Sequence, residues 1–274
     1  MLVSFARALG VDDQVLDPVA TDLLPRWLGR IAEAPRRLGS AGALYRKAVR
    51  ATTFGLIDHM VLRTKAIDAH LDSALRSGID QLVILGAGLD ARAWRLPTLE
   101  SATVFEVDHP ATQRYKQKRI GQRAPRADVR YVAVDFEKER FSHALKRAGF
   151  RLADPSVWIW EGVAMYLPPA AVHDTFEQLA SLAAAGSELA MTYRVPGMLP
   201  FGPVGRTLIP ALFNVGGEPL KSTLEPHELV STVAPDWEVV YDEDSRGWQK
   251  LTGSAADPSR SFLAERLAIA KRSA

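Results

Sequence analysis

The pattern of hydrophobic positions from residue 81 onward predicts an alternation of strands and helices. Mostly apolar runs that are typical of strands occupy residues 81–85, 102–108, 129–135, 156–161 and 188–194. The segments between them, such as 109–121 and 169–185, are helical in composition. Because the strand runs are nearly continuous in apolar residues, helices should cover both faces of the sheet. The pattern therefore predicts an α/β fold with a doubly wound, mainly parallel sheet.

The segments on either side of this alternation have different patterns. Residues 63–77 place apolar side chains at helical spacing before Gly78, which predicts a helix that leads into the first strand. Residues 1–35 have the pattern of short helices separated by prolines, and residues 41–62 have an amphipathic pattern in which Leu44 could line one face. We expect residues 1–62 to form an N-terminal helical cap on a core domain of residues 63–274.

The C-terminal third interrupts the alternation. Residues 195–222 mix apolar residues with prolines and glycines, and long ordered loops of this kind are usually functional, so a lid insertion is predicted here. A helix in 225–234 and two strands in 236–244 and 265–272 should complete the fold.

Composition limits the class of protein. The 274 residues are 47% hydrophobic, which is enough for one large domain with a lid. Lys and Arg number 34 against 32 Asp and Glu, and this balance gives no indication of a nucleic-acid partner. The absence of cysteine excludes disulfides and thiolate metal sites, and no metal site is predicted. Arg7 interrupts the apolar N-terminus and no run reaches the ~18 apolar residues of a membrane span, so we expect a cytoplasmic protein without a membrane partner.

A glycine-rich turn follows the first predicted strand. Residues 86–91 read GAGLDA and match the G-x-G-x-x-G/A pattern of nucleotide-binding loops. Gly86 and Gly88 would let the backbone approach a ligand, and the helix expected to follow would present a partial positive charge at its N-terminus. Alone, the motif is a weak signal, and a tight strand-to-helix turn without a ligand is the alternative.

Acidic residues at the ends of later strands favour a ligand. Asp108 ends the second strand about 20 residues after the loop, where a carboxylate can accept hydrogen bonds from two ribose hydroxyls. Asp135 and Phe136 end the third strand and could bind the amine and the ring of adenine. Glu161 ends the fourth strand. Carboxyl ends of parallel strands share one edge of a sheet, so these residues together predict a nucleoside-bearing cofactor.

The charges near the loop bear on which cofactor it is. The pyrophosphate of NAD would be repelled by Asp90 inside the loop, whereas the sulfonium and ammonium groups of S-adenosyl-L-methionine are compatible with acids. Arg63 could bind the carboxylate of that cofactor through a bidentate hydrogen bond, although a surface ion pair is the alternative for this residue. An NAD-dependent oxidoreductase and a noncatalytic cofactor-binding scaffold remain alternative hypotheses.

Five segments resemble blocks of the leucine carboxyl methyltransferase family, and most closely its bacterial branch of S-adenosylmethionine-dependent methyltransferases. The segments read RTKAIDAHL, LGAGLDARAWRL, VFEVDHPATQRYKQ, VAVDFEKE and WIWEGVAMYLPPAAV, and the resemblance runs from about Asp17 to about Ala180. Ala91 stands where the family usually has Thr, and Phe136 where Leu is common. Residues 195–222 have no counterpart, so the resemblance says least about the substrate.

The resemblance implies a class I methyltransferase fold, which is Rossmann-like, with a seven-stranded sheet whose last strand is antiparallel. It also implies S-adenosyl-L-methionine as cofactor and S-adenosyl-L-homocysteine as product. Arg63 would bind the methionine carboxylate, Gly86 would line the amino acid portion, and Asp108 would hold the ribose. Asp135 and Phe136 would contact adenine, and Glu161 would lie beside the methionine end.

Fewer features of the sequence bear on the methyl acceptor than on the cofactor. Tyr166 and Tyr193 follow the fourth and fifth strands and could orient an acceptor oxygen. Arg194 could pair with an acceptor carboxylate, and His59 could act as a general base for a hydroxyl. Apolar lid residues favour a small apolar acceptor of the natural-product type, as in secondary metabolism, and they are Met198, Leu199, Phe201, Leu208, Ile209, Leu212 and Phe213. The sequence thus predicts an O-methyltransferase for a carboxylate or hydroxyl, and it leaves the oligomeric state open.

Overall fold

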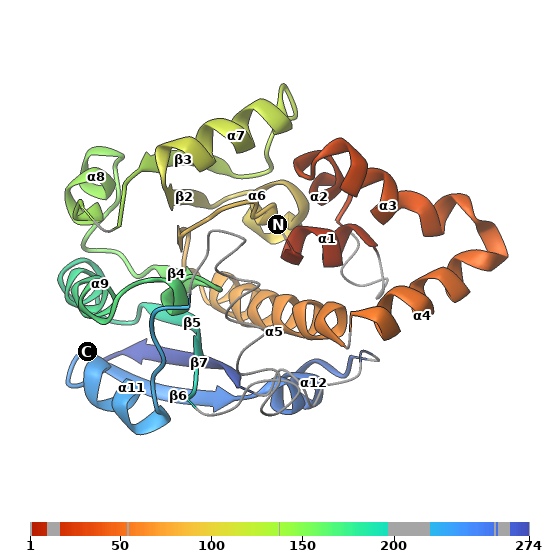
Figure 1. Cartoon of the computed structure of the whole chain (residues 1–274). Helices are drawn as coiled ribbons and strands as arrows, with labels where there is room; N and C mark the ends of the chain where they lie inside the picture. Colours follow the sequence, from red (N-terminus) through yellow and green to blue (C-terminus); the bar gives the residue numbers. More distant parts are fainter. Residues whose placement is uncertain are drawn as a thin grey trace.

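A computed structural model describes residues 2–9, 17–53, 55–136, 138–196, 220–254, 256 and 264–273. Within these residues a seven-stranded sheet has the order β3-β2-β1-β4-β5-β7-β6 (Figure 1). The strands are β1 (Gln81–Leu85), β2 (Thr103–Asp108), β3 (Asp128–Ala133), β4 (Val157–Trp160), β5 (Glu188–Arg194), β6 (Trp237–Glu243) and β7 (Glu265–Arg272). β7 pairs antiparallel with β5 and β6, and the other strand pairs are parallel. The predicted fold class is confirmed, including the antiparallel final strand.

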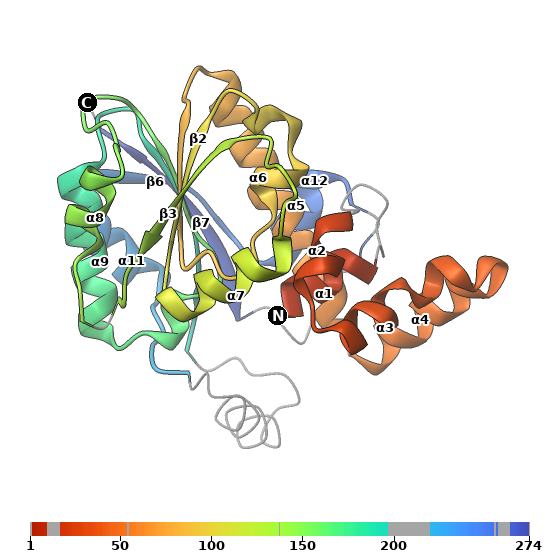
Figure 2. The ribbon, with the colours of Figure 1, turned by 90° about the horizontal axis from the view of Figure 1, so that it is seen from above.

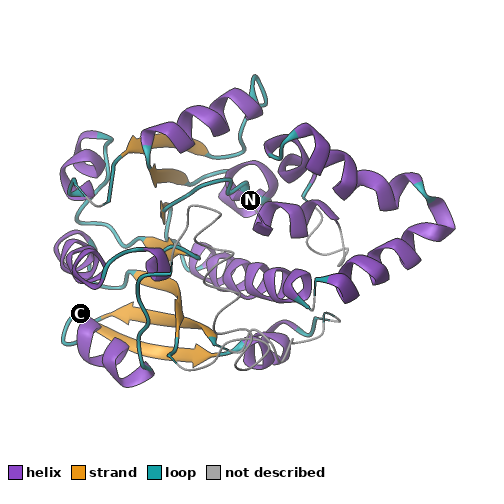
Figure 3. Ribbon diagram, in the orientation of Figure 1, coloured by secondary structure: helices purple, strands orange, loops and turns teal. Residues whose placement is uncertain are grey.

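Helices lie on both sides of this sheet, as Figure 3 shows. They are α1 (Leu2–Leu9), α2 (Pro18–Leu23), α3 (Arg26–Arg37), α4 (Gly42–Thr52), α5 (Leu56–Arg76), α6 (Arg92–Arg95), α7 (Pro110–Ile120), α8 (Phe141–Arg147), α9 (Pro169–Leu182), α11 (Pro226–Val233) and α12 (Ser245–Thr252). Short 3-10 turns are η2 (Gly39–Ala41), η3 (Pro97–Leu99) and η4 (Ala164–Tyr166). In the view from above, α8, α9 and α11 cover one face of the sheet, and α5, α6 and α12 cover the other (Figure 2).

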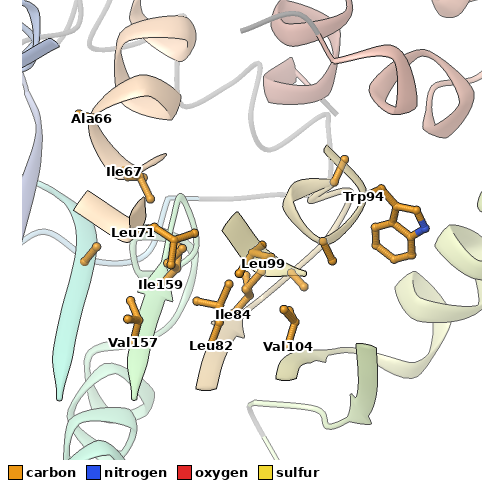
Figure 4. Packing of buried hydrophobic residues seen from close by; sticks show 14 of the residues in the cluster. Ala66, Ile67, Leu71, Leu82, Ile84, Trp94, Leu99, Val104, Val157 and Ile159 are labelled. Atoms are coloured by element: carbon orange, nitrogen blue, oxygen red, sulfur yellow. The ribbon is translucent and has the colours of Figure 1, made fainter. Parts of the chain in front are cut away.

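Alternation along each strand explains the two covered faces. On β1, Leu82 and Ile84 join a core cluster with residues of α5, whereas Val83 and Leu85 join the cluster on the other face. Figure 4 shows Leu82 and Ile84 beside Leu71 of α5. Because side chains of a strand alternate in direction, a strand buried on both faces is apolar at nearly every position. All five residues of β1 are buried, and the polar one, Gln81, hydrogen-bonds with the backbone of Arg151.

The N-terminal part departs from the predicted boundaries. The helix expected over 63–77 begins at Leu56 and ends at Arg76, so it runs through the predicted division between residues 62 and 63. Gly55, at a φ of +84°, caps this helix and separates it from α4. Together α3 and α4 project away from the body of the molecule (Figures 1 and 2).

One further difference lies in the C-terminal third. The helix α12 between β6 and β7 is not predicted by the hydrophobic pattern, and its Trp248 is fully buried against the core. The predicted lid residues between 197 and 219 lie outside the described residues. Among the helices that are described, none combines the length and the hydrophobicity needed to cross a bilayer.

Candidate functional site

The loop after β1 is held in place by β2 and by two glycines with positive φ. The amides of Gly86 and Ala87 both donate to the carbonyl of Val107, at 2.8 and 3.2 Å. Gly86 has a φ of +68° and Gly88 a φ of +50°, a region that other residues rarely adopt. A Cβ on Gly86 would lie 2.4 Å from Cγ2 of Val163, so this position also needs glycine for its close packing.

Asp108, at the end of β2, is fixed directly beneath this loop. Its Oδ2 accepts the amide of Gly88 in a very short hydrogen bond, and its Oδ1 accepts the amide of His109 at 2.6 Å. Burial raises the pKa of Asp108, although these two amides act in the opposite direction. Each carboxylate oxygen can accept more than one hydrogen bond, so Asp108 retains capacity for ligand hydroxyls.

The helix after the loop differs from the expectation. α6 has only four residues, and the Oδ1 of Asp90 accepts the amide of Arg92 at 2.7 Å in its first turn. The carboxylates of Asp90 and Asp108 therefore occupy the amides that a phosphate would need. A helix follows the loop as expected, but it is short, and the carboxylate of Asp90 already accepts the amide at its N-terminus.

Arg92 is the centre of a buried charge cluster. Its guanidinium is completely buried and contacts three carboxylates: Asp68 at 2.7 Å, Glu161 at 2.8 Å and Asp90 at a shorter distance. Burial alone would lower the pKa of Arg92, but the three acids raise it well above its ordinary value. Since these acids come from α5, the glycine loop and the end of β4, the arginine ties three parts of the site together.

Arg63 extends the cluster toward β7. Its Nε lies 3.0 Å from Oε1 of Glu161, and its Nη1 lies 2.6 Å from Oε1 of Glu265. The side chain is only 4% exposed, so the alternative of a surface ion pair is wrong. The two bonds use two of the five N–H donors of the guanidinium, which leaves donors for a ligand carboxylate. Gly162, at a φ of +66°, lies beside Nη2, where a Cβ would come within 3.4 Å.

Glu265 joins the acceptor candidates to this cluster. It begins β7 directly opposite Arg194 in the sheet register, and its Oε2 lies 2.6 Å from Nε2 of His59. Burial would raise the pKa of Glu265, but Arg63 and His59 lower it to about 2. Burial lowers the pKa of Arg194, and the nearby Glu265 and Tyr166 oppose that shift. The structure therefore brings His59, Tyr166 and Arg194 into the neighbourhood of Arg63.

Tyr193 lies elsewhere. Its ring belongs to the apolar cluster on the face covered by α8, α9 and α11, and its hydroxyl donates to Oδ2 of Asp242 at 2.6 Å. Burial and the neighbouring Asp242 raise the pKa of the Tyr193 hydroxyl. This predicted acceptor residue is thus not grouped with the other three.

Asp135 and Phe136 follow β3 on the Asp108 side of the site. The amide of Val134 donates to the carbonyl of Asp108 at 2.9 Å, which places this turn next to the end of β2. Asp135 forms an ion pair of 2.8 Å with Lys138, and Phe136 packs 5.9 Å from the ring of Phe141. The predicted cofactor residues thus form two groups at one sheet edge, the first around Asp108 and the second around Arg63 and Glu161.

The buried cluster should make the protein sensitive to acid. The pKa of Glu265 falls from 4.5 to about 2, which corresponds to about 3 kcal/mol of stability at neutral pH. Carboxyls with lowered pKa stabilise the fold above their unfolded pKa and lose that contribution as pH falls through the folded value. We expect the free energy of unfolding in urea to fall between about pH 4.5 and about pH 2. The other acids of the cluster with lowered pKa are Asp68, Asp90 and Glu161.

Two other buried acids act in the opposite direction. The pKa values of Glu106 and Asp108 are raised, chiefly by burial, so protonation of these groups favours the folded state. The four acids with lowered pKa outnumber them, and a net loss of stability is expected. An unfolding free energy that stays constant from pH 5 to pH 2.5 would contradict this assignment of charges.

The chain is similar in sequence to known proteins over its first two thirds. The sequence pattern of the family described as leucine carboxyl methyltransferase matches residues 1–180. A protein of Mycobacterium sp. (strain KMS), named "Putative S-adenosyl-L-methionine-dependent methyltransferase", is 42% identical over 147 residues, which are 53% of this chain and 48% of the relative. A protein of the same name from Mycobacterium marinum (strain ATCC BAA-535 / M) is 44% identical over 135 residues, or 48% of this chain and 43% of the relative. The chain spans about half the length of the curated relatives it matches.

Solved structures resemble the fold. A DUF574 family protein from Streptomyces avermitilis MA-4680 matches with a TM-score of 0.62 at 16% identity, over 85% of this chain and 90% of the other. A protein from Thermobifida fusca YX, titled as a "putative methyltransferase", also reaches 0.62 at 17% identity, over 89% and 94%. At this level of identity the likeness concerns the fold, and it agrees with the predicted methyltransferase-type architecture.

Proposed function

The chain belongs to the leucine carboxyl methyltransferase family, and from this premise we propose that it is an S-adenosyl-L-methionine-dependent methyltransferase. The observation that carries the proposal is the arrangement at the carboxyl edge of the sheet. There, the glycine loop with Asp108 and the buried Arg63–Glu161 pair lie at the ends of neighbouring strands.

The residues present fit the chemical groups of this cofactor. Asp108 accepts hydrogen bonds, as two ribose hydroxyls require, and Asp135 with Phe136 offers an acceptor and an aromatic surface for adenine. Arg63 retains donors for the amino acid carboxylate. The charged cluster brings four carboxylates to this edge of the sheet, and these acids are compatible with the ammonium and sulfonium groups of the cofactor. Its members are Asp68, Asp90, Glu161, Glu265, Arg63, Arg92 and Arg95.

The same geometry disfavours NAD. A pyrophosphate needs free backbone amides and little negative charge at the glycine loop. Here the amide of Arg92 donates to Asp90, which lies inside the loop where a pyrophosphate would bind, whereas Asp108 would suit the ribose of either cofactor. The acids that would repel two phosphates are compatible with the positive charge of a sulfonium.

The chain's own residues would act mainly by positioning. When bound, the cofactor would supply a methyl group on its sulfonium: the acceptor oxygen would form a bond to the methyl carbon as the bond between that carbon and sulfur breaks, and the sulfur would leave as a neutral thioether. Holding the reactants in line and excluding water can contribute about 7–11 kcal/mol to lowering the barrier. A carboxylate acceptor needs no general base, and Arg194 with Tyr166 would orient it. For a hydroxyl acceptor, His59 held by Glu265 would be the base candidate.

We propose a small, apolar, natural-product-like acid or alcohol as the acceptor. Support comes from the apolar composition of residues 197–219, which follow β5 along the chain. A screen of carboxylic acids and phenols with labelled cofactor would identify the acceptor. Transfer to one of them would exclude a noncatalytic scaffold.

A thermal shift with two ligands tests the cofactor. At a concentration near 100 Kd, S-adenosyl-L-homocysteine should add about 2.7 kcal/mol of stability. For a chain of this size we expect Tm to rise by roughly 5–10 °C. NAD at the same concentration should leave Tm unchanged. A rise in Tm with NAD alone would contradict the proposed function and favour an oxidoreductase.

The two tyrosines form a matched pair for the acceptor side. Tyr166→Phe should slow methyl transfer up to about 10-fold by removing one positioning hydrogen bond. Tyr193→Phe should leave transfer within about 2-fold and lower stability by about 1 kcal/mol, because its hydroxyl contacts Asp242 in the sheet. Neither change should alter the affinity for S-adenosyl-L-homocysteine. Slower transfer with Tyr193→Phe than with Tyr166→Phe would reverse the assignment.

A further inference from the structure

The helical arm formed by α3 and α4 has a charge unlike the rest of the chain. Residues 26–52 contain seven basic residues and one acid, Glu33, and the basic ones are Arg26, Arg30, Arg36, Arg37, Arg46, Lys47 and Arg50. The arm is therefore +6, whereas the whole chain is +2, so the remainder is −4. The net charge of the whole chain is nearly neutral, and the expectation of no nucleic-acid partner rests on it. That value does not show how the charge is divided between the arm and the rest of the chain.

An exposed apolar stripe runs along the same arm. Trp27 is 63% exposed, Ile31 39% and Leu38 46%, all well above the exposure usual for such side chains. At 100° per residue Trp27 and Ile31 of α3 and Leu38, the C-cap of that helix, lie within about 40° of one another. Arg26 and Arg30 lie on the adjacent side of the helix.

A neighbouring side of α3, which carries Gly29, Ala32 and Pro35, is buried against the protein itself. On α4, Leu44 is 70% exposed, although the sequence suggested that it could line the face of an amphipathic helix. The exposed apolar residues of the arm therefore face away from its contacts with the body of the protein.

We propose that this arm docks on the surface of a membrane that contains anionic lipids. A helix with a basic side and an apolar side that includes Trp lies in the interface between headgroups and acyl chains. Both views show the arm projecting from the body, so a flat surface can reach it (Figures 1 and 2). The expectation of no membrane partner rests on the lack of a spanning segment, which does not bear on a contact made at the surface.

Charge and shape favour a membrane over other partners. A second copy that met the arm with its own arm would bring +6 against +6, and like charges oppose such a contact. A second copy that met the arm with its −4 remainder would give a concentration-dependent oligomer in solution, and that result would overturn the proposal. Nucleic acid would use the basic side through its phosphates, but it would gain little from Trp27, Ile31 and Leu38. The combination of both sides matches an anionic lipid surface, and the inference does not depend on the proposed reaction.

Vesicle sedimentation with the full chain tests the proposal. We expect binding to phosphatidylcholine vesicles with 30% phosphatidylserine, little binding to pure phosphatidylcholine, and loss of binding in 0.5 M NaCl. Arg26→Gln combined with Arg30→Gln should weaken partitioning about 10- to 30-fold, since each basic residue near such a surface contributes about 5-fold. The matched control Arg114→Gln with Lys118→Gln removes the same charge from exposed positions of α7 and should change binding less than 3-fold.

The apolar side is tested separately. Trp27→Ser combined with Ile31→Ser keeps every charge, and it should also weaken vesicle binding at least 10-fold. Circular dichroism should show an unchanged fold, because both side chains are exposed. Equal losses in the α7 control, or full binding by the serine variant, would overturn the proposal. Tighter binding to duplex DNA or to polyglutamate than to the anionic vesicles would overturn it in favour of a nucleic-acid or acidic protein partner.

Discussion

Arg92→Met is expected to lower the free energy of unfolding by about 3–5 kcal/mol, because it removes the partner of three buried carboxylates. Methionine can fill much of the volume of the arginine stem but cannot neutralise charge. Asp90 and Glu161 would then remain close together without their main counter-charge, and both would take up protons at higher pH. Urea unfolding at pH 7 followed by circular dichroism measures the loss.

An exposed arginine provides the matched control for this change. Arg126 pairs with Glu100 at 2.5 Å, but both side chains are about half exposed, and such pairs contribute about 0–1 kcal/mol. Arg126→Met should therefore have little effect. The Arg92→Met variant should also regain part of its stability as the pH is lowered toward 5, whereas the parent protein should not. If the two methionine variants are equally stable, the buried cluster does not hold the site together.

The sheet could be predicted from the sequence because burial on both faces demands apolar residues at every strand position. The run at 188–194 coincides with β5, and the last strand was placed at 265–272, as observed for β7. The same reasoning placed Asp108 and Glu161 at one edge, since carboxyl ends of parallel strands coincide there. Strands that are packed on both faces therefore leave a clear signal in the sequence, which is a nearly continuous apolar run.

The charge cluster could not be predicted in the same way, because its members come from distant parts of the chain. Arg92 directly follows the glycine loop and reaches acids at 68, 90 and 161, and no local spacing encodes the contacts with 68 and 161. The sequence contains one signal that could have identified Glu265 as a site residue, namely its position at the start of the last strand. An antiparallel strand begins at the edge where its parallel neighbours end, so its first residue belongs to the ligand edge.

The exposed arm could not be predicted from the hydrophobic pattern for a different reason. Helical periodicity identifies which residues share a side, but it does not say whether that side meets the core or the solvent. Leu44 and Trp27 belong to helices with apolar sides, and both are more than 60% exposed. The net charge of short segments, as opposed to the net charge of the whole chain, is the sequence signal that distinguishes this arm from a buried helix.

Asp108→Asn is expected to weaken binding of S-adenosyl-L-homocysteine about 100-fold or more. Hydrogen bonds to a charged acceptor contribute about 1.5–3 kcal/mol each, and asparagine has only one acceptor oxygen. In the parent protein one carboxylate accepts the amides of Gly88 and His109 and can still accept two ribose hydroxyls. In the variant, an amide NH2 would face either a backbone N–H or a ligand hydroxyl. Isothermal titration calorimetry measures the affinity.

Asparagine is a sharper replacement than alanine here, because alanine would also release the glycine loop from β2. Asp128→Asn removes the same charge at the start of β3, at the opposite edge of the sheet, where Asp128 pairs with the partly exposed Arg130. Its affinity should match that of the parent protein. Unchanged affinity in Asp108→Asn would mean that another carboxylate holds the ribose. An equal loss in both variants would mean that overall charge, rather than the position of Asp108 beneath the loop, governs binding.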